Sequence, residues 1–440
     1  MSFTFIDLFA GIGGFHGALH ALGGEAVYAS EIDSAAIKVY ENNWKMNSDS
    51  DITHVANDQV MVVQKHDILT GGFPCQPFSK SGKQLGMEET RGTLFWNIAK
   101  IIEVQKPAIV LLENVRNLAG PKHINTTWVT IIRTLRSLGY RVSSVPLVVS
   151  PHKIHPRFGG TPQVRERIFI AATFVGIGAE ATKVEPDQLD LSKVMSDWDP
   201  QNWDLKRQLP LEKAGLTSNK HLELSPTEKS WVDAWNDFVL ACRAMKVDLP
   251  GFPLWSDFWK PKSKVRIPAE TPNWKRAFIK KNVEFYAQNE PMISKWLEKW
   301  DVATFPPSRR KFEWQAQDSK TLWECIMHFR PSGIRAKKAT YVPALVAITQ
   351  TTIYGPQKRR LSVRECARLQ GLPDWFDFNG QPESASYKQL GNGVNLPVVY
   401  HVLRALVERD KEFLQKSRPH LVASILEAPE YPNVMQPLQS

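Results

Sequence analysis

Residues 4–14 read Thr-Phe-Ile-Asp-Leu-Phe-Ala-Gly-Ile-Gly-Gly, a short apolar run that leads into a glycine-rich turn. Residues 15–22 follow with helical spacing, so the stretch predicts a strand, a tight turn and a helix. Glycines allow the backbone N–H groups of such a turn to approach a ligand closely. The dinucleotide-binding fingerprint requires a third glycine where this chain has His16, so the turn alone fits a nucleotide site and a simple tight turn equally.

Apolar runs alternate with helical stretches along the first 175 residues or so. This alternation predicts an α/β fold with a parallel sheet, in which ligands bind at the carboxyl ends of the strands. The apolar runs lie at 26–30, 60–63, 68–69, 108–112, 145–149 and 168–172, and the main helical stretches at 94–104 and 128–138.

Acidic residues adjoin several of these runs. Glu31 ends the second one, where a carboxylate can accept both ribose hydroxyls of an adenosine cofactor. Asp67 and Ile68, interpreted as another strand end, would offer an adenine ring one polar and one apolar contact. Glu113 follows the apolar residues 109–112, and a half-buried carboxyl group there can stay protonated and donate to a ring nitrogen.

Cys75 lies in residues 71–79, Gly-Gly-Phe-Pro-Cys-Gln-Pro-Phe-Ser, directly after a predicted strand and between two prolines. This is a typical place for a nucleophile, because a structural cysteine usually replaces a small apolar residue inside a strand or helix. Arg165 and Arg167 are candidate cations for stabilising its thiolate. The polar, glycine-bearing residues 80–92 could move as a lid.

The net charge of +10 is confined to one region of the chain. Residues 258–340 hold 18 Lys plus Arg against 8 Asp plus Glu, so the remaining residues sum to zero. An excess of positive charge favours an anionic partner, either nucleic acid or an acidic membrane surface. Candidates for contacting that partner are Arg309, Arg310, Arg335, Lys337 and Lys338.

Tryptophan is concentrated in the same part of the chain, with 11 of the 15 between residues 198 and 323. This change in composition predicts a second domain that begins near residue 180. Trp231 with Trp235, and Trp255 with Trp259, have the i,i+4 spacing that places two side chains on one helix face. We expect these rings to pack the core of the second domain rather than to stack on bases.

Several classes of protein are disfavoured. The chain has no run of eighteen apolar residues and no secretory signal at its start, which argues against a membrane span and export and favours the cytoplasm. Its cysteines form no metal-binding pattern, and His152 with His155 lack a second ligand pair, so we predict no metal. We interpret Cys242 and Cys366 as structural.

These motifs, in this order, resemble those of the DNA (cytosine-5)-methyltransferases. The resemblance covers roughly residues 3–175 and 355–405. It implies a Rossmann-like, S-adenosylmethionine-dependent methyltransferase sheet with a smaller inserted target-recognition domain. The blocks that carry it are residues 5–14, Glu31, 67–68, 73–79, 91–95, 113–115, 163–167, 364–371 and 389–394.

The resemblance also implies a division of the chain. Residues 1–178 would form the catalytic and cofactor-binding domain, and residues 179–354 the DNA-reading domain. Residues 355–415 would return to complete the catalytic domain, and residues 416–440 would be a peripheral tail.

The mechanism that the resemblance implies uses Cys75 as the nucleophile that adds to carbon 6 of a cytosine. Glu113 would donate to ring N3, and carbon 5 would take the methyl group of S-adenosylmethionine. Arg167 would contact the base and Arg165 would support the loop, although the division between them is open. A base inside a duplex must be flipped out for this reaction, and Ser79 and Ser81 match the part of the family that approaches DNA.

The cofactor-binding residues that the resemblance implies come from both ends of the chain. They are Asp7, Phe9, Gly11, Gly13, Gly14, Glu31, Ile32, Asp67, Ile68, Leu94, Asn392 and Val394.

Two other functions remain open on the sequence: a tRNA cytosine methyltransferase, and a DNA-binding module of the same fold without activity. The Pro-Cys-Gln-Pro sequence and the long inserted region favour DNA over tRNA, and the intact Cys75, Glu113, Arg165 and Arg167 favour an enzyme. The partner expected from the resemblance is double-stranded DNA, acted on by a monomer. A cognate restriction endonuclease, another defence system or a solitary role would each fit.

Overall fold

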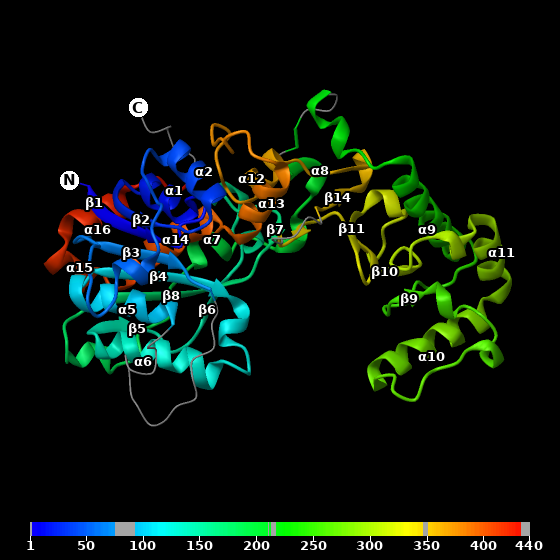
Figure 1. Cartoon of the computed structure of the whole chain (residues 1–440), viewed down its shortest axis with the longest axis horizontal. Helices are drawn as coiled ribbons and strands as arrows, with labels where there is room; N and C mark the ends of the chain where they lie inside the picture. The colour runs from blue at the N-terminus through cyan, green and yellow to red at the C-terminus, as the bar shows by residue number, and fades with distance from the viewer. Residues whose placement is uncertain (1, 75–92, 210, 213–216, 346–350, 433–440) are drawn as a thin grey trace.

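The computed structural model describes residues 2–74, 93–209, 211–212, 217–345 and 351–432. The described chain forms two parts (Figure 1), of which the first contains both ends of the chain and the second is made from its middle. The first part is built on a sheet flanked by helices, which is the predicted α/β class.

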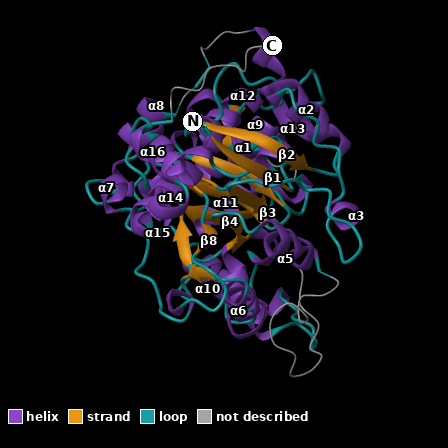
Figure 2. Ribbon diagram, turned by 90° about the vertical axis from the view of Figure 1, so that its left-hand side faces the viewer, coloured by secondary structure: helices purple, strands orange, loops and turns teal. Residues whose placement is uncertain are grey.

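The strand order in the first sheet is β2-β1-β3-β4-β8-β5, with β6 also paired to β8. Figure 2 shows β2, β1, β3, β4 and β8 side by side in that order. The strands are β1 (Phe3–Leu8), β2 (Gly24–Ser30), β3 (Ile68–Gly72), β4 (Ile109–Val115), β5 (Tyr140–Val142), β6 (Leu147–Val149) and β8 (Arg167–Phe174).

The pairs among β2, β1, β3 and β4 are parallel, whereas β8 is antiparallel to β4, β5 and β6. The prediction of a parallel sheet is therefore wrong at this edge. β8 follows β6 along the chain and pairs with it in the antiparallel direction. An antiparallel pair of this kind needs no crossover helix. The prediction of a strand at 60–63 is also wrong: these residues form no regular strand, and Val60 and Val62 are exposed.

Alternating side chains of the strands serve two separate cores. Phe3, Phe5 and Leu111 face one core, whereas Ile6 and Leu112 face the other. This period of two is what a sheet covered on both faces requires. The first core is closed by α1 (Gly14–Ala21), α2 (Ser34–Trp44) and α14 (Leu396–Arg409), and the second by α3 (Ile52–Val55), α5 (Leu94–Gln105) and α6 (Val129–Ser137).

The carboxyl-terminal segment returns to the first part, as the sequence predicts. It contains α12 (Val363–Leu369), α13 (Glu383–Asn392) and α14, and then α15 (Lys411–Ser417) and α16 (Pro419–Glu427). Figure 1 shows α15 and α16, in red, beside the blue amino-terminal strands. Leu421, Val422 and Ile425 of α16 are buried in the first core, so the prediction of a peripheral tail is wrong up to the end of this helix.

The second part has its own sheet, in the order β15-β14-β11-β12-β10-β9. Helices cover one face of it, and the strands lie on the side toward the first part (Figure 1). The elements are β9 (Leu254–Trp255), β10 (Lys311–Gln315), β11 (Ile326–Arg330), β12 (Gly333–Lys337), β14 (Ile353–Tyr354), β15 (Arg359–Arg360), α9 (Pro226–Ala244), α10 (Asn273–Gln288) and α11 (Glu290–Trp300).

Tryptophans fill the core of this second part, as the sequence predicts. The Trp235 ring stacks on Phe312 with 4.8 Å between centroids and meets Trp296 at the same distance. Trp231 and Trp235 lie on one helix, α9, but Trp255 lies on β9 and Trp259 follows a short 3-10 helix (Ser256–Phe258). The i,i+4 spacing therefore predicts the local structure of the first pair only.

The buried core of the second part runs from Leu224 to Ile353. Leu189 and Leu205, which fall inside the predicted 179–354 domain, are buried in the first core instead. A short strand pair also connects the two parts: β7 (Gln163–Val164) pairs in parallel with β13 (Val342–Pro343). The short helices α7 (Ser192–Met195) and α8 (Leu205–Gln208) belong to the stretch before the second core.

Candidate active site

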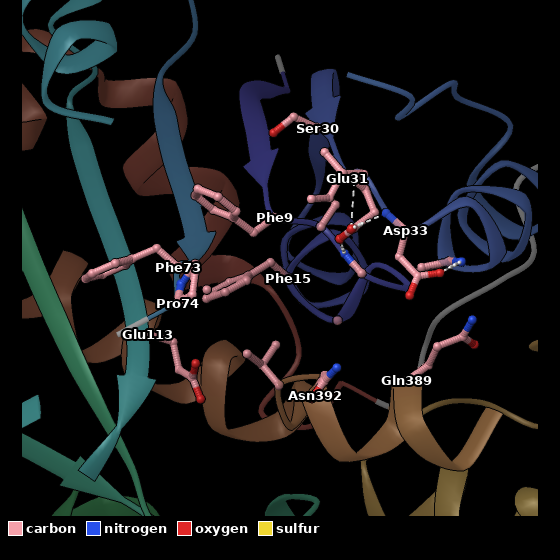
Figure 3. A pocket seen from close by; sticks show the side chains of 18 of the residues that line it. Phe9, Phe15, Ser30, Glu31, Asp33, Phe73, Pro74, Glu113, Gln389 and Asn392 are labelled. Atoms are coloured by element: carbon pink, nitrogen blue, oxygen red, sulfur yellow. Dashed lines mark hydrogen bonds between the residues drawn. The ribbon is translucent and has the colours of Figure 1, made fainter. Parts of the chain in front are cut away.

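A cavity of about 520 Å³ opens at the carboxyl ends of β1, β2, β3 and β4 (Figure 3). Its volume is in the range of sites for small molecules and cofactors. The cavity brings together residues from both ends of the chain, among them Phe9, Gly11, Gly14, Phe15, Glu31, Ile32, Ile52, Pro74, Leu94, Glu113, Arg167, Asn392 and Val394.

The glycine turn between β1 and α1 forms one wall. Gly11 and Gly13 have φ values of 55° and 87°, which suit glycine. A Cβ atom on Gly14 would lie 2.7 Å from Cγ2 of Val394, so only a bare backbone allows the turn to touch the carboxyl-terminal segment so closely. Gly13 packs against Trp44 and shapes the turn without lining the cavity.

His16, which stands where the dinucleotide fingerprint has glycine, is a core residue. Its ring stacks on Trp44 with 4.4 Å between centroids, and Nδ1 lies 2.7 Å from the Tyr40 hydroxyl. Burial lowers the pKa of His16 to about 3, so the ring is neutral. Its backbone N–H donates to the buried carboxyl of Asp7, which also accepts from Thr70. Asp7 therefore holds the start of α1 in place from inside the core and does not line the cavity.

Glu31 extends into the cavity beside this turn (Figure 3). Its Oε2 accepts a hydrogen bond from the backbone of Gly11 at 2.8 Å, and Oε1 accepts from the backbones of Ile32 and Asp33 at 2.8 Å each. A carboxylate has about four acceptor positions, so the described contacts leave about one, on Oε2. The sequence predicts a carboxylate free to take two hydroxyls, whereas the structure leaves room for one.

Asp67 is a corrected prediction. It precedes β3 and so lies at the amino ends of the strands, on the opposite side of the sheet from the cavity. There it accepts a hydrogen bond from the Thr4 backbone at 3.0 Å and pairs with Arg418 at 2.7 Å. Ile68, the first residue of β3, is buried in the first core and does not line the cavity either. The interpretation of this pair as a strand end mistook the beginning of the strand for its carboxyl end.

A second Asp-Ile pair, at Asp51 and Ile52, lines the cavity instead. The Asp51 carboxylate caps α3 by accepting from the Thr53 backbone at 2.8 Å, and this fixes Ile52 at the wall. The signal in the sequence was an aspartate followed by Ile-Thr-His-Val, a helix start with its capping residue. Periodicity does not single out this pair, because residues 51–55 do not follow an apolar run.

Glu113 and Arg167 face each other inside the cavity. Glu113 lies on β4, and its Oε1 is 2.9 Å from Nε of Arg167, which begins β8. Burial raises the pKa of Glu113, and the charges of Arg167 and Arg165 only partly oppose this. Despite this ion pair, the buried Oε1 has no hydrogen-bond partner among the described residues. A carboxyl group with this environment can hold a proton and offer it to a ligand in the cavity.

Arg165 has a different place from Arg167. It is 1% exposed and outside the cavity wall, and its guanidinium donates to the carbonyls of Gly391, Gly393 and Leu345. Burial, followed by the charge of Arg167, lowers the pKa of Arg165 to about 9. This side chain therefore holds the segment that carries Asn392 against the strand that carries Arg167.

The described chain before the predicted nucleophile ends at the cavity. Pro74 lines it, and the Phe73 carbonyl accepts a 2.7 Å hydrogen bond from Asn114 of β4. Cys75, Ser79 and Ser81, and the lid predicted at 80–92, lie outside the described residues.

The described cysteines are all buried. Burial raises the pKa of Cys242 and of Cys325 to about 12, and it also raises the pKa of Cys366. Cys242 packs in the second core and Cys366 in the first, as the sequence predicts of structural cysteines.

Two of the predicted DNA-binding arginines have internal partners. The guanidinium of Arg309 lies 4.5 Å from the ring centroid of Phe329 and 5.6 Å from that of Trp231. Arg310 pairs with Asp257 at 3.3 Å. The high local count of arginines thus overstates how many are available to a partner.

The other three predicted residues follow one another on and after β12. Arg335 pairs with Glu313 at 2.7 Å, and Lys338 pairs with the exposed Asp318 at 2.9 Å. Lys337 has no ion pair within the described residues, and burial lowers its pKa. The five predicted residues are therefore not equivalent.

Within the described ranges, no three His, Cys, Asp or Glu side chains are grouped so that they could hold a metal ion. None of the described helices combines the length and hydropathy needed to cross a membrane.

The chain belongs to the C-5 cytosine-specific DNA methylases, because the model of that family matches residues 3–408. It is accordingly a DNA (cytosine-5)-methyltransferase, and the predicted family and fold class are confirmed.

Among individual relatives, the chain is 46% identical to type II methyltransferase M.AluI of Cellulosimicrobium cellulans over 94% of this chain and 93% of that protein. It is 31% identical to type II methyltransferase M.HgiCI of Herpetosiphon aurantiacus over 91% of this chain and 96% of that one. Type II methyltransferase M.HhaI of Haemophilus parahaemolyticus is 45% identical over 38% of this chain and 47% of its own length.

Proposed function

We propose that the chain methylates carbon 5 of a cytosine in double-stranded DNA, with S-adenosylmethionine bound in the cavity at the carboxyl ends of the first sheet. One observation carries this proposal: a single cavity contains the glycine turn, the acceptor carboxylate of Glu31, and the buried pair Glu113 and Arg167. One half of the cavity suits a nucleoside and the other half suits a base that must be protonated.

The residues fit that cofactor in three respects. Oε2 of Glu31 keeps an acceptor position for a ribose hydroxyl, as described above. Phe9, Ile32 and Ile52 are apolar neighbours for an adenine ring. Gly14 has no side chain and lies against Val394, so its bare backbone forms part of the cavity wall. The amino-acid end of the cofactor can approach this backbone closely. When bound, S-adenosylmethionine supplies the methyl group to carbon 5.

The chain's own residues perform the chemistry on the base. The Cys75 thiolate adds to carbon 6 and Glu113 gives its proton to N3, which offsets the charge that addition pushes into the ring. The carbon-5 proton then leaves to solvent, the bond between carbon 6 and the Cys75 sulfur breaks, and N3 returns its proton to Glu113, which restores the aromatic ring. Arg167 keeps Glu113 oriented and faces the base, whereas Arg165 is a positioning residue that holds residues 391–393.

A cytosine in a duplex reaches this cavity only by leaving the base stack, so the reaction requires base flipping. We place Ser79 and Ser81 near the DNA at that point, on the resemblance. Several relatives carry type II methyltransferase names, which supports a restriction-modification setting in a prokaryotic cytoplasm, with a cognate endonuclease cutting the same sequence. We propose a monomer.

The decisive experiment replaces the nucleophile. Cys75→Ala should abolish transfer of labelled methyl groups to duplex DNA but leave DNA binding measurable, because the second part is untouched. Cys242→Ala, which removes a buried thiol of the second core, is the matched control and should still transfer. Methyl transfer by Cys75→Ala at the wild-type rate would show that the nucleophile is misassigned.

The same assay separates the two alternatives. Label that enters tRNA and not duplex DNA would indicate an RNA methyltransferase, and label in neither substrate would indicate an inactive binding module. Bisulfite sequencing of DNA from cells that express the protein then gives the target sequence and the modified cytosine.

A further inference from the structure

The second sheet has one apolar face and one polar face. On β10 and β12, Phe312, Trp314 and Ile334 point into the second core under the helices. Because side chains alternate along a strand, Glu313 and Arg335 point to the opposite face, where they lie directly across from each other. His328 of β11 is the antiparallel partner of Arg335 and shares that face.

The polar face is on the side of the sheet away from α9 and α11, toward the first part of the molecule (Figure 1). If the cytosine of a duplex occupies the cavity of the first part, the duplex approaches the second part from the side that faces the first part. The polar face is thus the surface of the second sheet that such a duplex would meet.

Arg335 is held in place by a carboxylate. Its Nε donates to Oε2 of Glu313 at 2.7 Å, and the two side chains are 27% and 21% exposed. Glu313 in turn accepts from Gln315 on the same strand. Within the described residues the two terminal nitrogens of Arg335 have no partner. An arginine fixed through Nε presents a rigid fork of donors on its remaining edge.

The same face carries positive charge that the described residues do not neutralise. Arg330 and Lys337 make no ion pair in the described chain, and the pKa of each is lowered by burial and by the neighbouring arginine charges. With Arg335 and with Lys311 of β10, the part of the face formed by β10, β11 and β12 has four cations against one carboxylate, Glu313. Burial lowers the pKa of His328 to about 3, so that ring adds no charge. Cations crowded in this way favour an anionic ligand.

We propose that Arg335, oriented by Glu313, reads a guanine of the target sequence through its two terminal nitrogens, while Arg330 and Lys337 contact backbone phosphates. The inference rests on the proposed function, because it takes double-stranded DNA as the substrate. A fixed arginine fork matches the O6 and N7 acceptors of guanine in the major groove. Arg330 and Lys337 have no ion-pair partner among the described residues, so they are suited to contact backbone phosphates. Such contacts position the duplex without reading its sequence.

The proposal changes the roles assigned from the sequence. Arg309 and Arg310 are occupied by partners inside the second part, and Lys338 is paired with Asp318. Arg330, which is not among the residues predicted from the sequence, joins Lys337 as a phosphate contact.

The first test is a double-mutant cycle between protein and DNA. The full-length protein is titrated with the duplex that bisulfite sequencing identifies, and with duplexes in which 7-deazaguanine replaces each guanine in turn, which removes N7 and keeps base pairing. For wild type, one of these replacements should weaken binding by about 5- to 150-fold. Arg335→Ala should weaken binding to the unmodified duplex by a similar factor and be insensitive to that same replacement.

Two variants protect this test against a folding defect. Arg335→Lys keeps the charge but loses the planar fork, and should lose the sensitivity to 7-deazaguanine while keeping the salt dependence of binding. Glu313→Gln should reduce the same sensitivity because it loosens Arg335. If Arg335→Lys and Arg335→Ala keep the full wild-type response to every guanine replacement, the base-reading role is overturned.

The second test addresses the phosphate contacts. Lys337→Ala and Arg330→Ala should each weaken binding to all duplexes alike and reduce the slope of log K against log salt by about 1. Lys338→Ala, whose charge Asp318 already balances, is the matched control and should change the slope less. An unchanged slope for both Lys337→Ala and Arg330→Ala would overturn this assignment. Failure of wild type to methylate any duplex would instead contradict the proposed function.

Discussion

Glu113 is the proposed proton donor, and its surroundings in the cavity shift its ionisation. Its carboxyl is almost fully buried and ion-paired with Arg167, and burial outweighs the pairing, so its pKa lies above the ordinary value. The group therefore keeps its proton to higher pH than an exposed glutamate. In the mechanism we propose, Glu113 donates to the cytosine ring and must be protonated when the thiolate adds, so we expect activity to depend on this shifted ionisation.

Glu113→Gln tests this dependence. For wild type, kcat should fall as pH rises through the raised pKa of Glu113, because the proton needed for donation is lost. The variant should turn over more slowly, by roughly 10²-fold or more, since an amide cannot release a proton to N3. It should also lack the fall in kcat that this ionisation causes. Single-turnover rates over a pH series provide the measurement, and a parallel fall in both proteins would assign the ionisation to another group.

At the scale of elements, the strand, glycine turn and helix at the start of the chain are where prediction worked best. The apolar run and helical spacing are local properties, so residues 4–22 could be predicted from the sequence. The role of Asp67 could not, because a residue at the beginning of a strand and one at its end look alike until the direction and neighbours of the strand are known. The antiparallel β8 likewise depends on contacts between distant residues.

Gly14→Ala probes the contact between this turn and the carboxyl-terminal segment. The added Cβ would lie 2.7 Å from Cγ2 and 3.0 Å from the carbonyl oxygen of Val394. Overpacking of this kind costs about 1–3 kcal/mol, which corresponds to about 5- to 150-fold weaker cofactor binding.

Calorimetric titration with S-adenosylmethionine measures the effect of Gly14→Ala, and adding Val394→Ala should restore part of the affinity because Cγ2 is removed. Gly251→Ala, at a glycine with open space around it, is the control and should bind like wild type. Equal affinities for Gly14→Ala and wild type would show that the turn and Val394 can separate at no cost.

At the scale of the whole molecule, the two parts of the chain are joined by contacts near the cavity. Arg165 links the carbonyl of Leu345 in the inserted region to Gly391 beside the cavity, and β7 pairs with β13. The charge distribution located the inserted region in the sequence. Its boundaries were harder to predict, because Leu189 and Leu205 are as apolar as the residues of the second core yet pack in the first.

Leu421→Ala tests whether α16 is part of the first core. Removing a fully buried leucine side chain should cost about 2–5 kcal/mol of stability and lower the midpoint of unfolding of the first part. Glu427→Ala changes an exposed residue of the same helix and should shift stability by less than about 0.5 kcal/mol. Denaturant unfolding followed by tryptophan fluorescence and by activity compares the two variants. An unchanged midpoint for Leu421→Ala would show that α16 is peripheral.

The contact between Gly14 and Val394 also sets the order in which a newly made chain becomes competent. These two residues are 380 positions apart, and α16, which packs against β1, comes later still. A polypeptide still on the ribosome has its glycine turn early but no opposite wall for the cavity. The cavity can close only after Val394 has been made, so a chain that stops before this residue lacks one wall of the cavity.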